Sequence, residues 1–189
     1  MAQTRIPPLH PPYEPEVDGL LGAMMPPGVP PILLFRTFAR NRAMTAAMQG
    51  WGSYELGRHL SLSMREREIV IDRTCARCGC EYEWGVHVVF FAERVGFTPA
   101  QLTSLTHGRP ADPCWTEPRE ALLIRAADAL HDRADIDDAL WAELHDRFSA
   151  AELLDLLMLC GWYHAVSFAA NGARVPLEEG APRFADVGA

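Results

Sequence analysis

The stretch that decides the fold is Glu68-Ile-Val-Ile-Asp-Arg-Thr-Cys75-Ala-Arg-Cys78-Gly-Cys80-Glu-Tyr82-Glu83-Trp84-Gly-Val-His87. It begins inside an expected helix, because Ser63-Met-Arg-Glu66 is a capping box that predicts a helix from about Met64 towards Arg77. Gly79 is expected to break that helix, and a second helix is expected from about Cys80 to Val95, closed by Gly96. If the turn at Gly79 makes the two helices antiparallel, side chains of both meet on one inner face.

Acidic and imidazole side chains gather on that face. Glu83 and His87 are four residues apart in the expected helix, and Cys80 lies three residues before Glu83. Glu68 approaches them from the preceding helix, and Cys75 lies two turns after Glu68. A carboxylate beside an imidazole in an apolar site can hold and pass protons near neutral pH. The alternative is a surface ion pair, with Glu68 in a solvated charge cluster.

Three clustered cysteines offer a different chemistry. Cys75 and Cys78 form a Cys-x-x-Cys pair, and Cys80 follows two residues later. In a reducing compartment such a pair can be redox-active, or the three thiols can be small buried side chains. No second Cys-x-x-Cys or His-x-x-x-His completes a zinc site, so we expect no metal. The five cysteines are an odd number, which favours free thiols.

Helical signals continue along the rest of the chain. Apolar residues recur at helical spacing over residues 32–51, and Thr98-Pro-Ala-Gln101 is another capping box. Thr116 and Pro118 predict a helix that ends near His131, and Asp135 can cap a helix over residues 136–148. A final capping box, Ser149-Ala-Ala-Glu152, opens a long apolar helix to about Asn171. No run alternates with period two for long, so the chain is predicted to be all-α with about seven helices.

Prolines dominate the N-terminal segment. Residues 1–31 hold nine of the fifteen prolines, so this arm is expected to be neither helix nor central strand. It is expected to extend along its own core or along a neighbouring subunit. The domain organisation is therefore a Pro-rich arm over residues 1–30 and a single helical domain over residues 31–189.

Composition excludes several function classes. The 189 residues are 49% hydrophobic and 22% charged, with a formal net charge of −8. That charge argues against binding to nucleic acid or to an anionic membrane surface. No signal peptide is visible, and Asp155 and His164 interrupt the most apolar stretch, 153–170, so a cytoplasmic protein is expected. No phosphate-binding loop, nucleophile elbow or His-Glu-x-x-His motif is present, and no cofactor is expected.

Other residues are weaker candidates. Tyr163 and His164, in the last long helix, either reach the same pocket or cap the core with polar tips. The other histidines have no spacing that raises them above surface or core residues, and the tryptophans are expected to pack rather than to bind a cofactor: His59, His107, His131 and His145; Trp51, Trp84, Trp115, Trp141 and Trp162.

At the central motif the chain resembles the carboxymuconolactone decarboxylase and alkylhydroperoxidase D superfamily. The peroxidase branch carries Glu-x11-Cys-x2-Cys-x3-His, and here Glu68, Cys80 and His87 match the glutamate, the first cysteine and the histidine. Glu83 stands where the second cysteine belongs, which resembles the decarboxylase branch. The likeness spans roughly residues 30–183. It implies an all-helical fold, homo-oligomers such as trimers or hexamers, or a dimer, and a site near or between subunits.

The glutamate in place of the second cysteine separates the two chemistries. A thiol peroxidase needs a second thiol to resolve the sulfenic acid, and Glu83 cannot do so. The preferred interpretation is acid–base chemistry of a lyase or decarboxylase type on a small organic acid or lactone. Its expected catalytic residues are Glu68, Cys80, Glu83 and His87; its candidate substrate-binding residues are Arg73, Tyr82, Tyr163 and His164.

Within that interpretation, His87 or Glu83 delivers a proton to the carbon that loses CO2, Glu68 orients the histidine, and Arg73 anchors a carboxylate. Two alternatives stay open. One is a thiol-dependent peroxidase that uses Cys75, Cys78 or Cys80. The other is a non-catalytic, ligand-binding oligomer, because a fold alone does not fix a function.

Overall fold

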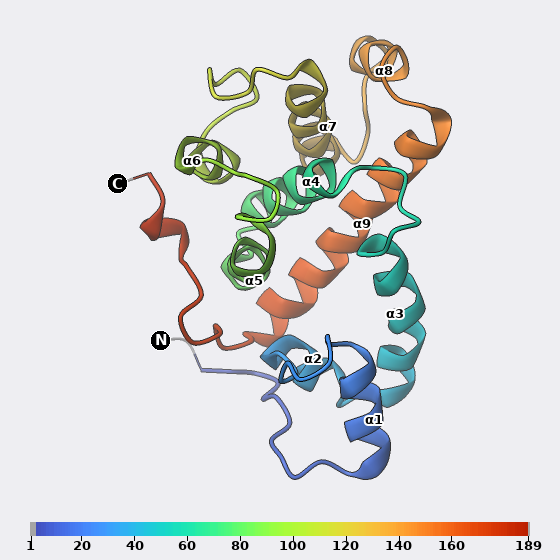
Figure 1. Ribbon diagram of the computed structural model, residues 1–189, viewed down its shortest axis with the longest axis vertical. Helices are drawn as coiled ribbons and strands as arrows, with labels where there is room; N and C mark the ends of the chain where they lie inside the picture. Colours follow the sequence, from blue (N-terminus) through green and yellow to red (C-terminus); the bar gives the residue numbers. More distant parts are fainter. Residues whose placement is uncertain (1–2, 189) are drawn as a thin grey trace.

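The computed structural model describes residues 3–188, and over that range it is all-helical. Figure 1 shows the helices arranged around α4 and α9 near the middle of the molecule. The elements in chain order are α1 (Pro15–Ala23), α2 (Leu33–Phe38), α3 (Arg42–Glu55), α4 (Met64–Arg77), α5 (Glu81–Phe91), α6 (Pro99–His107), α7 (Pro118–Arg133), α8 (Asp138–His145), α9 (Ala150–Ala173) and the short 3-10 turn η1 (Phe184–Asp186).

Helix α4 is the centre of the fold. The predicted capping box is present, because the Ser63 side chain accepts from the Glu66 N–H while the Glu66 carboxylate accepts from the Ser63 N–H. The helix packs against α5, α6, α7 and α9. Ile69, Val70 and Ile71 are consecutive and all fully buried, so α4 has no apolar stripe but is enclosed on every side along this stretch. Charged residues on α4 are therefore forced into the interior.

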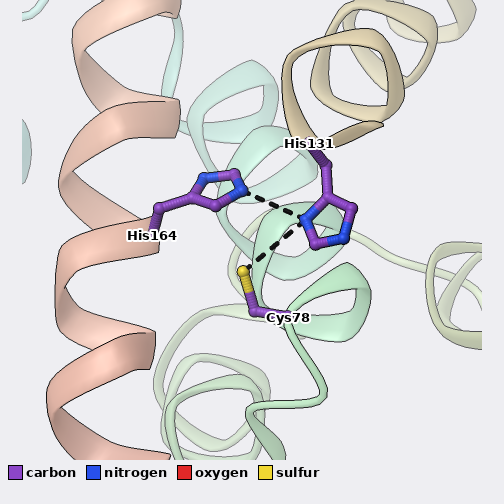
Figure 2. A group of neighbouring side chains, drawn as sticks. All are labelled: Cys78, His131 and His164. Carbon is purple, nitrogen blue, oxygen red and sulfur yellow. Dashed lines mark hydrogen bonds between the residues drawn. The ribbon is translucent and has the colours of Figure 1, made fainter. Parts of the chain in front are cut away.

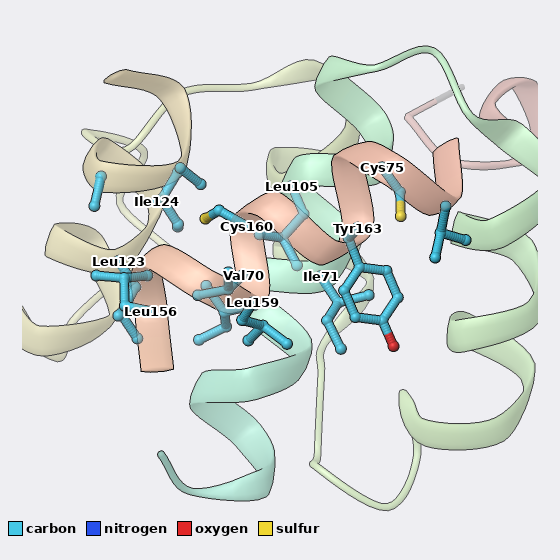
Figure 3. Packing of buried hydrophobic residues seen from close by; sticks show 14 of the residues in the cluster. Val70, Ile71, Cys75, Leu105, Leu123, Ile124, Leu156, Leu159, Cys160 and Tyr163 are labelled. Atoms are coloured by element: carbon cyan, nitrogen blue, oxygen red, sulfur yellow. The ribbon is translucent and has the colours of Figure 1, made fainter. Parts of the chain in front are cut away.

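Helix α9 supplies the other half of the core. Its capping box at Ser149 and Glu152 is present as predicted, and it runs for 24 residues. Leu156, Leu159 and Cys160 pack among side chains of α4, α6 and α7 (Figure 3). By length and hydropathy α9 is the one helix within residues 3–188 able to cross a membrane, but half of that stretch is buried inside the protein. This is the usual composition of a central helix in a folded core.

The turn between α4 and α5 has the predicted break. Gly79 adopts a φ of 59°, a left-handed conformation that glycine reaches without strain. The Cys80 N–H donates to the Cys75 carbonyl at 2.8 Å, which closes the end of α4, and Cys80 then occupies the N-cap position of α5. Helix α5 ends at Phe91, four residues before the predicted Val95, and turns lead from there to Gly96.

Two other predicted helices differ from those observed. The helix expected over residues 32–51 is two helices, α2 and α3, separated at Asn41, whose side chain accepts from the Met44 N–H and starts α3. The helix expected after Asp135 is instead capped by Asp137, which accepts from the Leu140 N–H, and it ends at His145. In both places the helix, α3 or α8, starts directly after a residue whose side chain caps it, Asn41 or Asp137.

The N-terminal arm is not free of helix, so that prediction was wrong. Helix α1 starts at Pro15, and proline at the first position of a helix loses no hydrogen bond. Val17 and Leu21 are buried against Ala39, and the Arg36 Nε donates to the Leu9 carbonyl at 2.8 Å. The arm thus packs against α2 and the α2–α3 turn of its own chain.

Candidate active site

A histidine–glutamate pair joins α5 to α4 in the core. The His87 Nδ1 lies 2.7 Å from the Glu68 Oε2, which is hydrogen-bond distance. Glu68 is fully buried and His87 is 3% exposed. The predicted meeting of the two helices is therefore present, and the solvated-cluster alternative does not describe Glu68.

An arginine also contacts Glu68. The Arg67 Nε donates to the Glu68 Oε1 at 2.7 Å, and the Arg67 Nη1 donates to the Leu56 carbonyl at 3.0 Å. The guanidinium lies 5.0 Å from the centre of the Phe91 ring, and the Phe91 ring lies 5.4 Å from that of His87. The buried carboxylate of Glu68 thus has a cationic partner on one oxygen and an imidazole on the other, which meets the requirement for burying a charge.

The other ring nitrogen of His87 faces a tyrosine hydroxyl and a second carboxylate. Its Nε2 lies 3.1 Å from the Tyr163 hydroxyl and 3.5 Å from the Glu83 Oε1. Tyr163 comes from α9, and its ring meets that of His87 edge-on at 5.1 Å. The Glu83 Oε2 is buried and has no hydrogen-bond partner among the described residues. A buried carboxylate oxygen without a donor is costly, so a donor from a substrate would find an acceptor here.

The protonation of His87 follows from these neighbours. Burial alone lowers the pKa of His87, but the charge and hydrogen bond of Glu68, followed by those of Glu83, outweigh it and raise the pKa to about 10. At neutral pH the ring is therefore an imidazolium. Its Nδ1–H donates to Glu68, and its Nε2–H points to Tyr163 and Glu83.

One buried acid on α4 was not among the predicted site residues. Asp72 is 1% exposed, and its Oδ1 has no hydrogen-bond partner within the described chain. Burial first, and then the charge of Glu68, raise the pKa of Asp72 well above its usual range, which favours the protonated form of this carboxyl. Asp72 lies one helical turn after Glu68, and that i,i+4 spacing was the available signal.

The buried thiols close to the pair are poorly ionised. Burial raises the pKa of Cys80 to about 11 and that of Cys75 well above its usual range. Cys75 lies 4.0 Å from the Ser167 hydroxyl of α9. No cysteine forms a disulfide. The pattern is that of buried, protonated thiols in the resting protein.

Two of the candidate substrate-binding residues contact other parts of the fold. The Arg73 Nε and Nη2 donate to the two carboxylate oxygens of Asp128 in α7, at 2.6 and 2.9 Å. Its Nη1 donates to backbone carbonyls at the end of α6. The Tyr82 hydroxyl donates to the Glu178 carboxylate at 2.5 Å and accepts from the Leu34 N–H at 2.9 Å. Arg73 thus ties α4 to α6 and α7, and Tyr82 ties α5 to α2 and the C-terminal segment.

His164 and Cys78 lie in a second cluster, together with His131. The His131 Nδ1 is 3.1 Å from the His164 Nε2 and 3.8 Å from the Cys78 Sγ (Figure 2). The structure therefore separates the neighbouring residues Tyr163 and His164 into two sites. His131 had no partner in the linear sequence, because its neighbours come from two other helices.

Several solved structures share the fold of this protein. The sequence matches no protein-family model and no curated protein. Among solved structures it is similar to an uncharacterized peroxidase-related protein from Silicibacter sp. TM1040, with a TM-score of 0.80, 16% identity, and 97% of this chain and 99% of that chain covered. It is also similar to an alkylhydroperoxidase AhpD core protein, an uncharacterized peroxidase-related protein from Ralstonia eutropha JMP134, with a TM-score of 0.78, 14% identity, and coverage of 92% and 93%.

A third similar structure is the debrominase Bmp8, with a TM-score of 0.72, 14% identity, and 94% of each chain covered. Another structure of that enzyme holds 2,3,4-tribromopyrrole. At these identities the likeness concerns the fold. The predicted fold class is confirmed: this chain has the alkylhydroperoxidase D-like helical fold that peroxidase-related proteins and a debrominase share.

Proposed function

We propose that the chain is an acid–base enzyme in which His87 donates a proton to a small organic acid or lactone, in a reaction of the lyase or decarboxylase type. One observation supports this above the others. The His87 imidazolium is fixed between the Glu68 carboxylate on Nδ1 and the Glu83 and Tyr163 side chains on Nε2, away from bulk water. A proton donor held in a dry site and oriented by a carboxylate is the usual arrangement of a general acid.

The proposed step balances without a further reagent. The bond between the carboxylate and its carbon breaks, CO2 leaves, and the electron pair stays on the carbon as a carbanion or enolate. The Nε2–H of His87 gives its proton to that carbon, and the ring regains a proton from solvent after product release. Glu68 holds the Nδ1–H throughout and stabilises the positive ring before transfer.

The second candidate function is thiol chemistry at Cys80. It has a specific basis, because Cys80 occupies the N-cap position of α5, three residues before Glu83, and because proteins of the same fold include peroxidase-related proteins and a debrominase. With a pKa of about 11, however, only about one Cys80 thiol in ten thousand is ionised at pH 7. The resting site favours proton transfer over attack by a thiolate.

Access to the site requires a side chain to move. His87 is 3% exposed, and the partly buried Phe91 ring lies 5.4 Å from the His87 ring, centre to centre. Arg67 and Arg94 lie 5.0 and 5.8 Å from the centre of the Phe91 ring. We propose that Phe91 is the side chain that moves to admit substrate, because its ring lies against the imidazole and close to the exposed Arg94, a cation that attracts a carboxylate.

Variants of the full-length protein separate the two candidates. Small carboxylic acids and lactones are screened for CO2 release and for ring opening. With a substrate in hand, His87→Gln and Glu83→Gln are expected to lower kcat by at least about 100-fold, whereas Cys80→Ser and Cys75→Ser keep most of it. Cys114→Ser, a partly buried cysteine near α6, is the matched control.

The reverse result contradicts the acid–base proposal. Peroxide-dependent loss of titratable thiols that Cys80→Ser abolishes, together with activity that survives His87→Gln, establishes the thiol reaction instead. A crystal soaked with a substrate acid adds a structural test, because density for its carboxylate is expected beside the Nε2 of His87.

Self-association belongs to the same proposal. Leu154, Met158 and Phe168 on α9 are 63%, 48% and 68% exposed, and such large apolar side chains on one helix support a contact between copies of this chain. The mass in solution, measured by light scattering, tests it: a trimer or hexamer, or a dimer, is expected, and a monomer at micromolar concentration contradicts it.

A further inference from the structure

Three helices place a sulfur and two ring nitrogens at one point, outside the His87 site. Cys78 is the C-cap of α4, His131 lies in the last turn of α7, and His164 lies in the middle of α9. Their donor atoms all lie within 4.8 Å of one another. Figure 2 shows the three side chains pointing towards a common centre from three directions.

The spacing of these atoms fits a tetrahedral ion. Zinc binds histidine nitrogen at about 2.0–2.1 Å and cysteine sulfur at about 2.3 Å, so two tetrahedral ligands are about 3.4 Å apart for a nitrogen pair and about 3.6 Å for sulfur and nitrogen. Here the His131 Nδ1 and His164 Nε2 are 3.1 Å apart, and the Cys78 Sγ is 3.8 Å from the His131 Nδ1. The Cys78 Sγ and the His164 Nε2 also lie within 4.8 Å of each other, so all three donor atoms can turn towards one ion.

The His164 ring is already oriented for a ligand role. Its Nδ1–H donates to the Cys160 carbonyl one helical turn earlier, at 2.8 Å. When the ring proton sits on Nδ1, the Nε2 that faces the cluster keeps a lone pair for a ligand role. Metal-binding histidines commonly donate their other N–H to a carbonyl or carboxylate in this way.

The surroundings are neither closed nor strongly charged. All three residues are partly exposed, so an ion can enter and solvent can occupy a fourth position. Of the nearby acids on α7, Asp128 is paired with Arg73 and Arg77, and Asp132 is paired with Arg77. The donors that remain for an ion are the thiol and the two imidazoles, a set that suits zinc and disfavours magnesium or calcium.

Protonation in the metal-free protein is consistent with that role. Burial lowers the pKa of His131, as do Arg77 and His164, so this ring is neutral at pH 7. Burial raises the pKa of Cys78, so its thiol keeps a proton until a cation displaces it.

We propose that Cys78, His131 and His164 form a binding site for one first-row divalent cation, with Zn2+ as its best fit and a solvent molecule as the fourth ligand. The site is separate from His87, and the proposal stands whether or not the proposed acid–base function does. It predicts that an occupied site holds Cys78 as a metal-bound thiolate and so removes it from redox chemistry.

Cobalt titration of the reduced full-length protein tests the ligand set. One equivalent of Co2+ is expected to give tetrahedral visible bands and a near-ultraviolet sulfur-to-cobalt band, and Zn2+ is expected to displace it. Cys78→Ser removes the sulfur band. His131→Gln and His164→Gln weaken Zn2+ binding by more than about 100-fold, since even the loss of a residue that only orients a ligand costs about 10- to 100-fold. His107→Gln, an exposed histidine bonded to the Phe184 carbonyl, and Cys114→Ser keep wild-type affinity.

Alkylation by iodoacetamide, read by mass spectrometry, gives a second measurement within one molecule. Zn2+ is expected to slow the modification of Cys78 at least tenfold and to leave that of Cys114 unchanged. Three results overturn the proposal: binding of less than one equivalent, a sulfur band that survives in Cys78→Ser, or equal protection of Cys78 and Cys114. A sulfur band that is lost in Cys80→Ser also overturns it, because the metal is then bound by the other thiols.

Discussion

The two histidine clusters of this protein are built on the same two helices and yet have opposite electrostatics. The buried site around His87 takes Glu68 from α4 and Tyr163 from α9. The partly exposed site around His131 takes Cys78 from α4 and His164 from α9. The first holds its imidazole charged between carboxylates, and the second holds a neutral imidazole beside another imidazole and a thiol.

The difference shows that partners, and not burial alone, decide the charge of a histidine. His87 is the more buried of the two titrating rings, and burial by itself lowers the pKa of both. Only His87 has carboxylates at 2.7 and 3.5 Å, and they reverse the effect of burial. Three substitutions and one labelling experiment test this comparison.

Glu68→Gln is expected to have the largest effect. It leaves Arg67 buried without its carboxylate partner and removes the anion that stabilises the His87 imidazolium. Breaking a buried pair from one side costs about 3–5 kcal/mol of unfolding free energy, measured by urea titration at pH 7. Glu143→Gln, which breaks an exposed pair with Arg125, is the control and is expected to change little. An equally small effect of both substitutions would show that the buried pair contributes no more than a surface one.

His87→Gln is expected to change how stability depends on pH. The folded-state pKa of His87 is raised to about 10 from an unfolded value of 6.5, so the folded protein binds the extra proton between these limits. The contribution is complete below about pH 6.5 and is lost as pH rises towards 10, at up to about 1.4 kcal/mol per pH unit. The difference in unfolding free energy between the wild-type protein and His87→Gln, measured at each pH, isolates this contribution. If the difference in unfolding free energy between the two proteins stays constant from pH 7 to 10, the His87 ring is not charged in the folded protein.

Tyr163→Phe is expected to have a smaller effect on the same site. It removes the hydroxyl that lies 3.1 Å from the His87 Nε2, and a hydrogen bond of this kind contributes about 1–2 kcal/mol. Because the hydroxyl contacts the proton that His87 is proposed to transfer, the pH profile of kcat is expected to shift together with a loss of about tenfold in rate. A merely structural tyrosine would lower stability and leave the profile where it is. Tyr54→Phe, which loses a hydroxyl bonded to Asp155, is the matched control.

Thiol accessibility gives the smallest and most local test. Cys78 and Cys114 are partly exposed, whereas Cys75, Cys80 and Cys160 are buried. In the native protein the first two are expected to react with iodoacetamide at least about tenfold faster than the other three, since only an accessible thiolate reacts. Rapid native-state modification of Cys80 would show that the acid–base site opens readily and would favour thiol chemistry there.

Local patterns of the sequence determined the helices that carry the candidate site. The capping boxes at Ser63, Thr98 and Ser149 are all present, because each needs only side chains within one turn. The turn at Gly79 and the i,i+4 pair of Glu83 and His87 are equally local. The sequence alone therefore predicted an all-helical fold and the meeting of Glu68 with His87.

Packing between distant helices decided what the sequence could not. Tyr163 and His164 are neighbours in the chain but point to different sites, because successive residues of a helix are about 100° apart. Arg73, expected as a substrate anchor, binds Asp128, which lies 55 residues away. His131 gained its partners only when α4, α7 and α9 came together. Hydrogen bonds inside a turn are encoded within a few residues, whereas contacts across the core depend on how whole helices pack, which no short pattern specifies.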